Sequence, residues 1–202
     1  MLSRWLDYLK PEVITLEFSQ YGMMFRRMHR AKLRAKLDLL VEKMGLDQGE
    51  IKKGALEVLY DYIDLPYEYT EALGYAERFK IPFHLLDLDL FSYLNLQRID
   101  ELLDEKNVRC WLSEHEEAEQ EAGKQRALAR LFFDKGLRTF SHTDEMIVRD
   151  RHLKERLAFL ISRCQEKRVL HVCGWQHLSD PYNIFDALNP RKVFAYDRSI
   201  CI

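Results

Sequence analysis

The sequence predicts an α/β fold: a helix-rich domain with a small parallel or mixed sheet covered by helices, and a helical insertion. Four short runs of apolar or β-branched residues predict strands, and long stretches with helical periodicity separate them. The chain has 202 residues, of which 47% are hydrophobic, so it is long enough to bury a sizeable core. We therefore expect a single α/β domain over residues 1–202.

The first half of the chain begins with a short strand signal and continues with helical patterns. Residues 12–17 (EVITLE) predict the first strand, because Pro11 ends any helix formed by the first ten residues. From residue 22 to residue 44, leucines and other apolar residues recur at three- and four-residue spacing, which predicts a helix that ends at Gly45. Further helices are predicted over 50–63 and 66–80, and the helical insertion over about 20–65.

The second half of the chain carries the other strand signals. Residues 81–90 (IPFHLLDLDL) predict the second strand, since leucine and aspartate alternate toward its end. Helices are predicted over 92–105, 113–134 and 144–165, the third strand over 168–173, and a fourth strand (KVFAY) over 192–196.

Composition excludes several classes of protein. Charged residues make up 32% of the chain but nearly cancel, to a net charge of -2, so no general attraction to nucleic acid or membrane is expected. The first residues lack the apolar core of a signal peptide, and no later segment has the length of a membrane span. The four cysteines have no metal-site spacing and are expected to be buried thiols in a reducing compartment. We therefore expect a soluble, cytoplasmic protein.

Residues with catalytic potential follow the predicted strands. Glu17 ends the first strand, Asp87 or Asp89 the second, and His177 lies just beyond the third. If the strands are parallel, these side chains gather at one edge of the sheet, where carboxylates and an imidazole can bind a divalent metal or divide acid and base roles. The alternative is a helix-capping or ion-paired glutamate and a structural histidine.

Two predicted helices carry further candidates. Glu68 and Glu71 share a helix face and can point at the same cleft, although such pairs are also common on solvated helices. Arg149 and Arg151 flank Asp150 near a helix start, where guanidinium groups could clamp a substrate carboxylate or phosphate, or an internal acid. On pattern alone, an amphipathic helix with its charges in water is favoured.

Four segments, taken in order, resemble the TraB/PrgY group of the superfamily that includes Tiki proteases, ChaN-like proteins and erythromycin esterases. They are PEVITLEFSQ, EYTEALGYAERFKIPFHLLDLDL, MIVRDRHLKERL and RVLHVCGWQHL. The match rests on short motifs that extend over most of the chain. It implies an α/β domain with a metal-dependent or acid/base hydrolase site, for peptide bonds in the Tiki branch and a macrolactone ester in the esterase branch.

The resemblance also implies roles for particular residues. Glu17 would be a metal ligand or base, and His177, in the second GxxH motif with Gly174, would ligate a metal or act as general base. A bound divalent metal would be Mn, Co or Zn. Glu68 and Glu71 would be candidates for a second carboxylate. Arg149 and Arg151 would anchor the acids or the substrate, and Trp175 would line the pocket. Asp87, at a strand end, is expected to contact the substrate.

The sequence departs from the family pattern at its start. The family's first strand, with another GxxH, should precede Pro11, but only ten residues stand there, and neither His29 nor His84 replaces it. Two hypotheses follow. The first is a hydrolase-like protein that acts on a small molecule or peptide. The second is a catalytically inactive ligand-binding or regulatory protein, which the association of ChaN-like proteins with haem makes plausible. The missing strand would leave a sheet edge that a second copy could cover, so a homodimer is expected.

Overall fold

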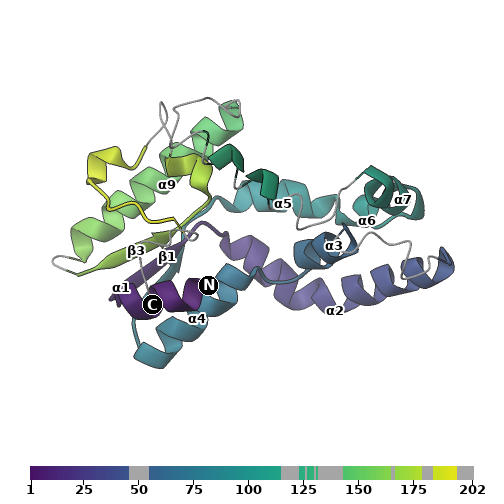
Figure 1. Ribbon diagram of the computed structural model, residues 1–202, viewed down its shortest axis with the longest axis horizontal. Coiled ribbons are helices and arrows are strands. Elements are labelled where there is room, and N and C mark those ends of the chain that lie inside the picture. The colour runs from purple at the N-terminus through teal and green to yellow at the C-terminus, as the bar shows by residue number, and fades with distance from the viewer. Residues whose placement is uncertain are drawn as a thin grey trace. The chain divides into compact units, whose positions relative to one another are not determined.

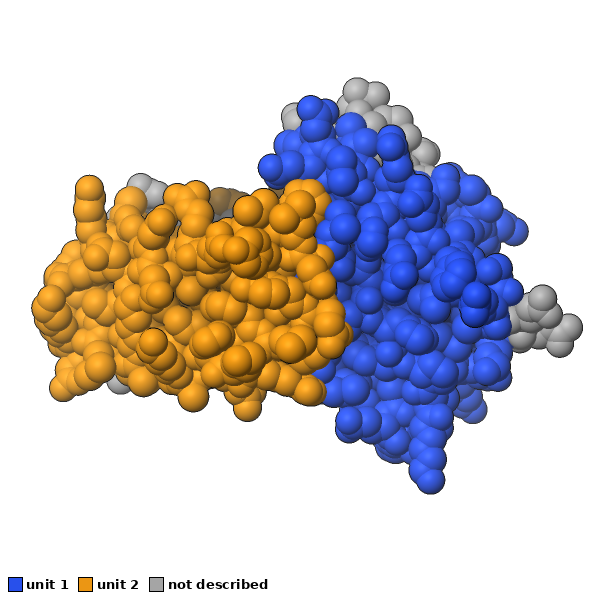
Figure 2. Space-filling model, turned by 180° about the vertical axis from the view of Figure 1, so that it is seen from behind, with its two compact units in different colours: residues 1–19, 67–88, 132–202 blue, residues 20–66, 89–131 orange. Residues whose placement is uncertain are grey.

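The computed structural model describes residues 1–45, 55–114, 123–125, 127–129, 131, 143–164, 167–178 and 184–194. The chain forms two compact units, which are coloured separately in Figure 2. Unit 1 comprises residues 1–19, 67–88 and 132–202, and unit 2 comprises residues 20–66 and 89–131. The helical insertion predicted over about 20–65 thus falls in unit 2, which also includes a second stretch of chain.

Unit 1 contains a small parallel sheet of three strands in the order β2-β1-β3 (Figure 1). The strands are β1 (Val13–Leu16), β2 (Phe83–Leu85) and β3 (Val169–Val172). Thr15 of β1 lies opposite His84 on one side and His171 on the other. This architecture confirms the predicted α/β fold, and it brings the carboxyl ends of all three strands to one edge of the sheet.

The central strand is fully buried, as a parallel strand covered on both faces must be. Before it, helix α1 (Leu2–Leu9) ends at Lys10, which adopts a left-handed conformation with φ of 47°. Pro11 then prevents any continuation of the helix and directs the chain into β1. Alternation along β1 sends Ile14 to one face of the sheet and Thr15 to the other.

Helices cover both faces of the sheet in unit 1 (Figure 1). Helix α1 and helix α4 (Tyr67–Phe79) pack on the face that carries Ile14. Helix α9 (Asp144–Arg163) buries Leu153 and Leu157 against Leu86 and residues after β3. Two short 3-10 helices follow β3: η1 (Trp175–Leu178) and η2 (Asp186–Leu188).

Helix α9 starts where its sequence predicts a helix start. The Thr143 hydroxyl accepts a hydrogen bond from the Met146 N–H at 3.3 Å and caps the first turn. Asp144 and Glu145 place negative charge at the positive end of the helix dipole. The cap therefore fixes the turn that precedes Arg149 and Asp150.

Unit 2 is helical in its described residues and has a core of its own. Its described helices are α2 (Gln20–Lys43), α3 (Ala55–Ile63), α5 (Asp89–Gln97), α6 (Ile99–Leu102) and α7 (Glu105–Glu114). Leu37 and Leu59 are buried at the centre of this core. Gly45 ends α2 with φ of 58°, a conformation that glycine adopts without strain. Within the described residues, no helix combines the length and the apolar character needed to cross a membrane.

The structure corrects two predicted strands. Of the fourth strand predicted over 192–196, residues 192–194 have no strand structure, and 195–196 lie outside the described residues. The Lys192 ammonium instead contacts the Leu178 carbonyl and the Asp186 carboxylate. The prediction was wrong for 192–194 because an apolar run of this length is too short for its periodicity to identify a strand. The second strand is shorter than predicted, because Asp89 already lies in the first turn of α5. An acidic residue is favoured there by the helix dipole.

Helix boundaries also differ from those predicted. The helix predicted over 92–105 is divided into α5 and α6 and ends before α7. Most of the helix predicted over 113–134 lies outside the described residues, as do residues 50–54 and 165 of two other predicted helices. No described observation bears on the predicted covering of a sheet edge by a second copy, which stays a prediction.

Replacing Leu153 by alanine should destabilise unit 1 strongly. Leu153 is fully buried between α9 and the sheet, so the substitution removes apolar contacts and leaves a cavity. We expect a loss of about 2–5 kcal/mol in the free energy of unfolding, measured by urea denaturation. Val148→Ala, on the same helix but 55% exposed, is the control and should cost no more than about 0.5 kcal/mol. Equal losses in the two variants would contradict this packing.

Candidate functional site

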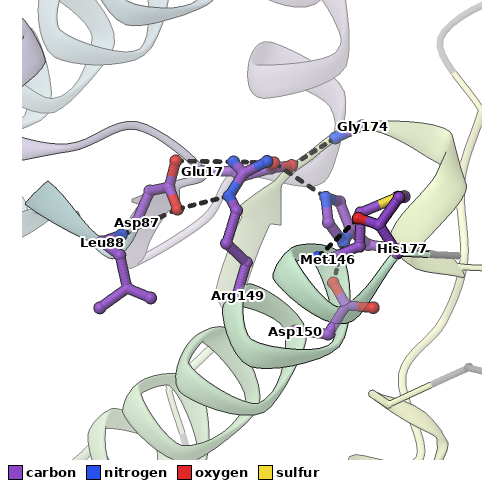
Figure 3. Close-up of polar contacts among 9 residues, drawn as sticks. Glu17, Asp87, Leu88, Met146, Arg149, Asp150, Gly174 and His177 are labelled. Carbon is purple, nitrogen blue, oxygen red and sulfur yellow. Dashed lines mark hydrogen bonds and ion pairs between the residues drawn. The ribbon is translucent and has the colours of Figure 1, made fainter. Parts of the chain in front are cut away.

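Glu17 lies immediately after β1, and its carboxylate receives hydrogen bonds from three separate parts of unit 1 (Figure 3). The Gly174 N–H, just after β3, donates to Oε2 at 2.8 Å. The Arg149 Nη2 group of α9 donates to Oε1 at 2.8 Å. The His177 Nε2 atom of η1 also lies 2.8 Å from Oε1. Glu17 therefore joins the ends of two strands to a helix and a turn.

Arg149 holds a second carboxylate through a two-point contact. Its Nε donates to Asp87 Oδ1 at 3.0 Å and its Nη2 to Asp87 Oδ2 at 2.7 Å. The Leu88 N–H donates to Asp87 Oδ1 at 2.8 Å and holds that carboxylate in place after β2. The planar guanidinium suits such paired contacts, which a lysine could not reproduce.

His177 is bonded on both sides of its ring. Its Nδ1 contacts the carboxylate of Asp150, the residue that follows Arg149 on α9, and its Nε2 contacts Glu17. The His177 and Asp150 side chains are only 4% and 2% exposed. We call Glu17, Asp87, Arg149, Asp150 and His177 the strand-end cluster; in it, carboxylates and cations alternate in space.

Gly174 contributes its backbone to the cluster. A methyl group added at its Cα would lie 3.6 Å from Glu17 Oε2, an ordinary van der Waals contact. A side chain would therefore fit at this position of the GxxH motif. What Gly174 contributes to the cluster is its backbone N–H. Its carbonyl accepts a bond from the His177 N–H at 3.2 Å, which closes the turn that carries the imidazole.

The surroundings of His177 make it a cation at neutral pH. Burial alone would lower its pKa, but hydrogen bonds to Asp150 and Glu17 and the charges of both outweigh burial and raise the pKa to about 9. Burial raises the pKa of Glu17, yet the bonds from His177 and Gly174 and the charge of Arg149 bring it below its usual value. The pair thus consists of an imidazolium and a carboxylate.

A second histidine lies deeper in the sheet and has the opposite character. His171 of β3 bonds through Nδ1 to the Thr15 hydroxyl at 2.9 Å, and burial lowers its pKa to about 4. It is therefore neutral. The neighbouring Cys173 thiol has a raised pKa because it is buried, so it is not a thiolate nucleophile.

The structure brings together only some of the predicted residues. Glu17, Asp87, Arg149 and His177 meet in the cluster. Other predicted candidates differ in exposure: Glu68 and Trp175 are half-buried, whereas Glu71 and Arg151 are exposed. Among the described residues, Glu68, Glu71 and Arg151 have no side-chain hydrogen bond or ion pair with any other. Asp89, the alternative to Asp87, accepts instead the Tyr21 N–H in unit 2, at 2.7 Å.

Sequence reasoning did not identify Asp150 as a site residue. The signal was present, because Asp150 is spaced three and seven residues from Leu153 and Leu157 and so shares their apolar helix face. A carboxylate on such a face needs a buried partner. His171 was also missed, since alternation along a strand does not reveal a partner on the neighbouring strand.

The cluster as it stands does not fit the implied divalent metal. A ligating histidine must be neutral and offer a lone pair. Both ring nitrogens of His177 face carboxylates and are engaged by them, so neither offers a free lone pair. In the part of the chain that the structure describes, no group of three or more His, Cys, Asp or Glu side chains could hold a metal ion.

Comparisons with models of protein families, with curated proteins and with solved structures gave no match to this chain.

The charged His177 should make unfolding depend on pH in a defined window. Its pKa is 6.5 in an unfolded chain and about 9 in the folded protein. The stabilisation is therefore complete below about pH 6.5 and is lost as the pH rises through about 9. We expect the stability difference between the protein and His177→Gln to shrink by on the order of 3 kcal/mol across this window. Urea denaturation at several pH values measures it, and a constant difference would contradict a charged imidazole.

Removing Arg149 should cost much more stability than removing its neighbour Arg151. Arg149→Met leaves the Asp87 carboxylate, 9% exposed, without its cation, and leaves the Glu17 carboxylate, 12% exposed, with His177 alone. We expect a loss of roughly 2–4 kcal/mol, somewhat below the value for a fully buried pair. Arg151→Met, on the exposed side of the same helix, is the matched control and should change stability by about 0.5 kcal/mol at most. Similar losses of stability in the two variants would mean that the ion pairs of Arg149 do not stabilise the fold specifically.

Proposed function

We propose that this protein is an acid–base hydrolase of an ester or peptide bond and that the strand-end cluster is its active site. The observation that carries the proposal is the continuous chain of hydrogen bonds from Asp150 through His177 to Glu17. This chain holds an ionised carboxylate at the carboxyl edge of a parallel sheet, where α/β proteins place their ligands and where such a group can act as a general base.

In the proposed reaction, the Glu17 carboxylate accepts a proton from a water molecule as that water attacks the substrate carbonyl. Glu17 then gives this proton to the leaving alcohol or amine when the carbon–oxygen or carbon–nitrogen bond breaks, and so returns to its ionised form. The His177 imidazolium stays protonated throughout, since its Nε2 lies 2.8 Å from Glu17 Oε1 and its positive charge favours the ionised carboxylate. One water is consumed, and an acid and an alcohol or amine are formed.

Asp150 and Arg149 act in this scheme as positioning residues. Asp150 orients the imidazole and stabilises its positive charge, as the aspartate of a serine-protease triad does. Arg149 aligns Glu17 while Asp87 fixes the guanidinium plane. The Arg149 side chain is 27% exposed, so part of it also remains accessible to a substrate carboxylate or carbonyl oxygen.

We propose no metal-dependent step, because the donor atoms of His177 are already committed to carboxylates. A relationship to the TraB/PrgY group is part of the proposal. Its support is the direct contact among Glu17, Arg149 and His177, which come from three of the four segments that carry the resemblance. The scheme uses a single histidine, and so does not need the first GxxH motif.

A second candidate is a catalytically inactive protein that binds a small molecule or peptide. The observation that favours it is the internal pairing of the cluster, in which both ring nitrogens of His177 and both oxygens of Glu17 have partners within the protein. In that case the cluster would hold the strand ends together without reacting.

Hydrolysis of p-nitrophenyl esters and short fluorogenic peptides tests the proposal. Activity requires ionised Glu17 and protonated His177, so kcat/KM should rise at a pH below the usual glutamate range and fall above a pH of about 9. Glu17→Gln and His177→Gln should each lower kcat/KM by roughly 10²- to 10⁴-fold.

The control for these variants is Arg151→Met, which should keep full activity because Arg151 is exposed and outside the cluster. Circular dichroism checks that each variant is folded. Failure to hydrolyse any member of either panel, or activity that survives in folded Glu17→Gln, would favour the binding protein over the hydrolase.

A further inference from the structure

Unit 1 contains a cavity of about 480 Å³ beside β3, outside the strand-end cluster. Its walls are one side of α1, including Trp5, one side of α9, including Leu157, the length of β3, and parts of residues 184–193, including Phe185 and Val193. We call it the β3 cavity. Its volume lies within the range of about 300–1,000 Å³ that is typical of small-molecule sites.

Buried apolar residues and several basic residues both line the β3 cavity. Trp5, Leu157 and Phe185 are buried, which gives the interior its apolar character. Four basic residues also line it: Lys167, Arg168, Arg191 and Lys192. Among the described residues that line it, none is aspartate or glutamate. A ligand with an apolar body and a negative head would match both parts.

Among the described residues, two of these four cations form ion pairs and two do not. Arg168 lies 3.5 Å from Glu12, and Lys192 lies 3.2 Å from Asp186. The exposed side chains of Lys167 and Arg191 form no hydrogen bond or ion pair with any other described residue. Both are therefore available to an anion without the loss of an existing contact.

The ring of His171 adds a polar point to the wall. Its Nδ1 is bonded to Thr15, but its buried Nε2 has no hydrogen-bond partner among the described residues. Buried polar atoms are nearly always paired, and an unpaired one in a pocket wall is typical of a site that a ligand or water completes.

We infer that the β3 cavity binds a single-chain amphipathic carboxylate, with its alkyl chain among the apolar walls and its head group beside Lys167 and Arg191. Burying the chain supplies a free energy proportional to the apolar area removed from water. The positive charges of Lys167 and Arg191 favour a negatively charged head group over a positively charged one. The inference does not depend on the proposed hydrolase, because the residues of the strand-end cluster are not among those that line the cavity.

Calorimetric titration of the full chain with decanoate tests the inference, with decylammonium as a ligand of the same chain length and opposite charge. Both are kept below the concentration at which they form micelles. We expect saturable binding of one decanoate per chain, and binding of decylammonium at least about tenfold weaker. Absence of saturable decanoate binding, or equal affinity for the two ligands, would overturn the inference.

Variants locate the binding in the β3 cavity. Val193→Trp, in a segment without regular structure, fills the cavity and should weaken decanoate binding by about tenfold or more. The double variant Lys167→Glu with Arg191→Glu should weaken it by a similar factor and reduce the preference over decylammonium. Arg156→Glu, an exposed residue of α9 that does not line the cavity, is the charge control and should change the affinity less than twofold or so.

Unchanged affinity in folded Val193→Trp would place decanoate elsewhere and contradict the inference. An equal loss in Arg156→Glu and in the double variant would show a general effect of net charge and would also contradict it. The comparison of the two ligands on the unmodified protein stands even if a variant fails to fold.

Discussion

The arrangement of unit 1 depends on one buried carboxylate. Glu17 follows the central strand, in a setting where a charge is costly unless hydrogen bonds and opposite charges surround it. Gly174, Arg149 and His177 supply those bonds from the end of β3, from α9 and from η1. Each contact therefore satisfies Glu17 and also fixes the position of a different element. The carboxylate is stable only when the sheet, the helix and the turn are all in place.

His177 and Glu17 are in contact, yet the imidazole is protonated and the carboxylate is ionised. His177 and Glu17 are close enough to share a proton, yet Asp150 raises the proton affinity of the imidazole while Gly174 and Arg149 favour ionised Glu17. Asp150 and Arg149 are adjacent in the sequence and serve opposite ends of this pair. One turn of α9 therefore influences the charge on both groups, and Thr143 caps the turn that precedes it.

Sequence reasoning predicted the parts of the fold and site that depend on local pattern. The parallel sheet followed from short strands between helices, and the strand ends identified Glu17, Asp87 and His177 because parallel strands finish at one edge. The partners of those residues depend on tertiary packing. The helical pattern around Asp150 suggested a charge in water and did not reveal its buried partner. The i and i+3 spacing of Glu68 and Glu71 places them on one helix face but does not say what that face contacts, so their role stays a prediction. Residues 192–194 of the fourth predicted strand form no strand for a similar reason, since five residues of sequence cannot reveal whether a neighbouring strand exists.

The order of the elements along the chain has a consequence for synthesis on the ribosome. The strands that precede Glu17 and Asp87 emerge early, whereas α9 and β3, which carry Arg149, Gly174 and His177, are made only after unit 2. During that interval the two carboxylates remain in water, where an unpaired charge carries no desolvation cost. Charged side chains at the end of an incomplete sheet oppose pairing with other chains. The same groups that hold the finished protein together are thus hydrated charges until α9 and β3 supply their partners.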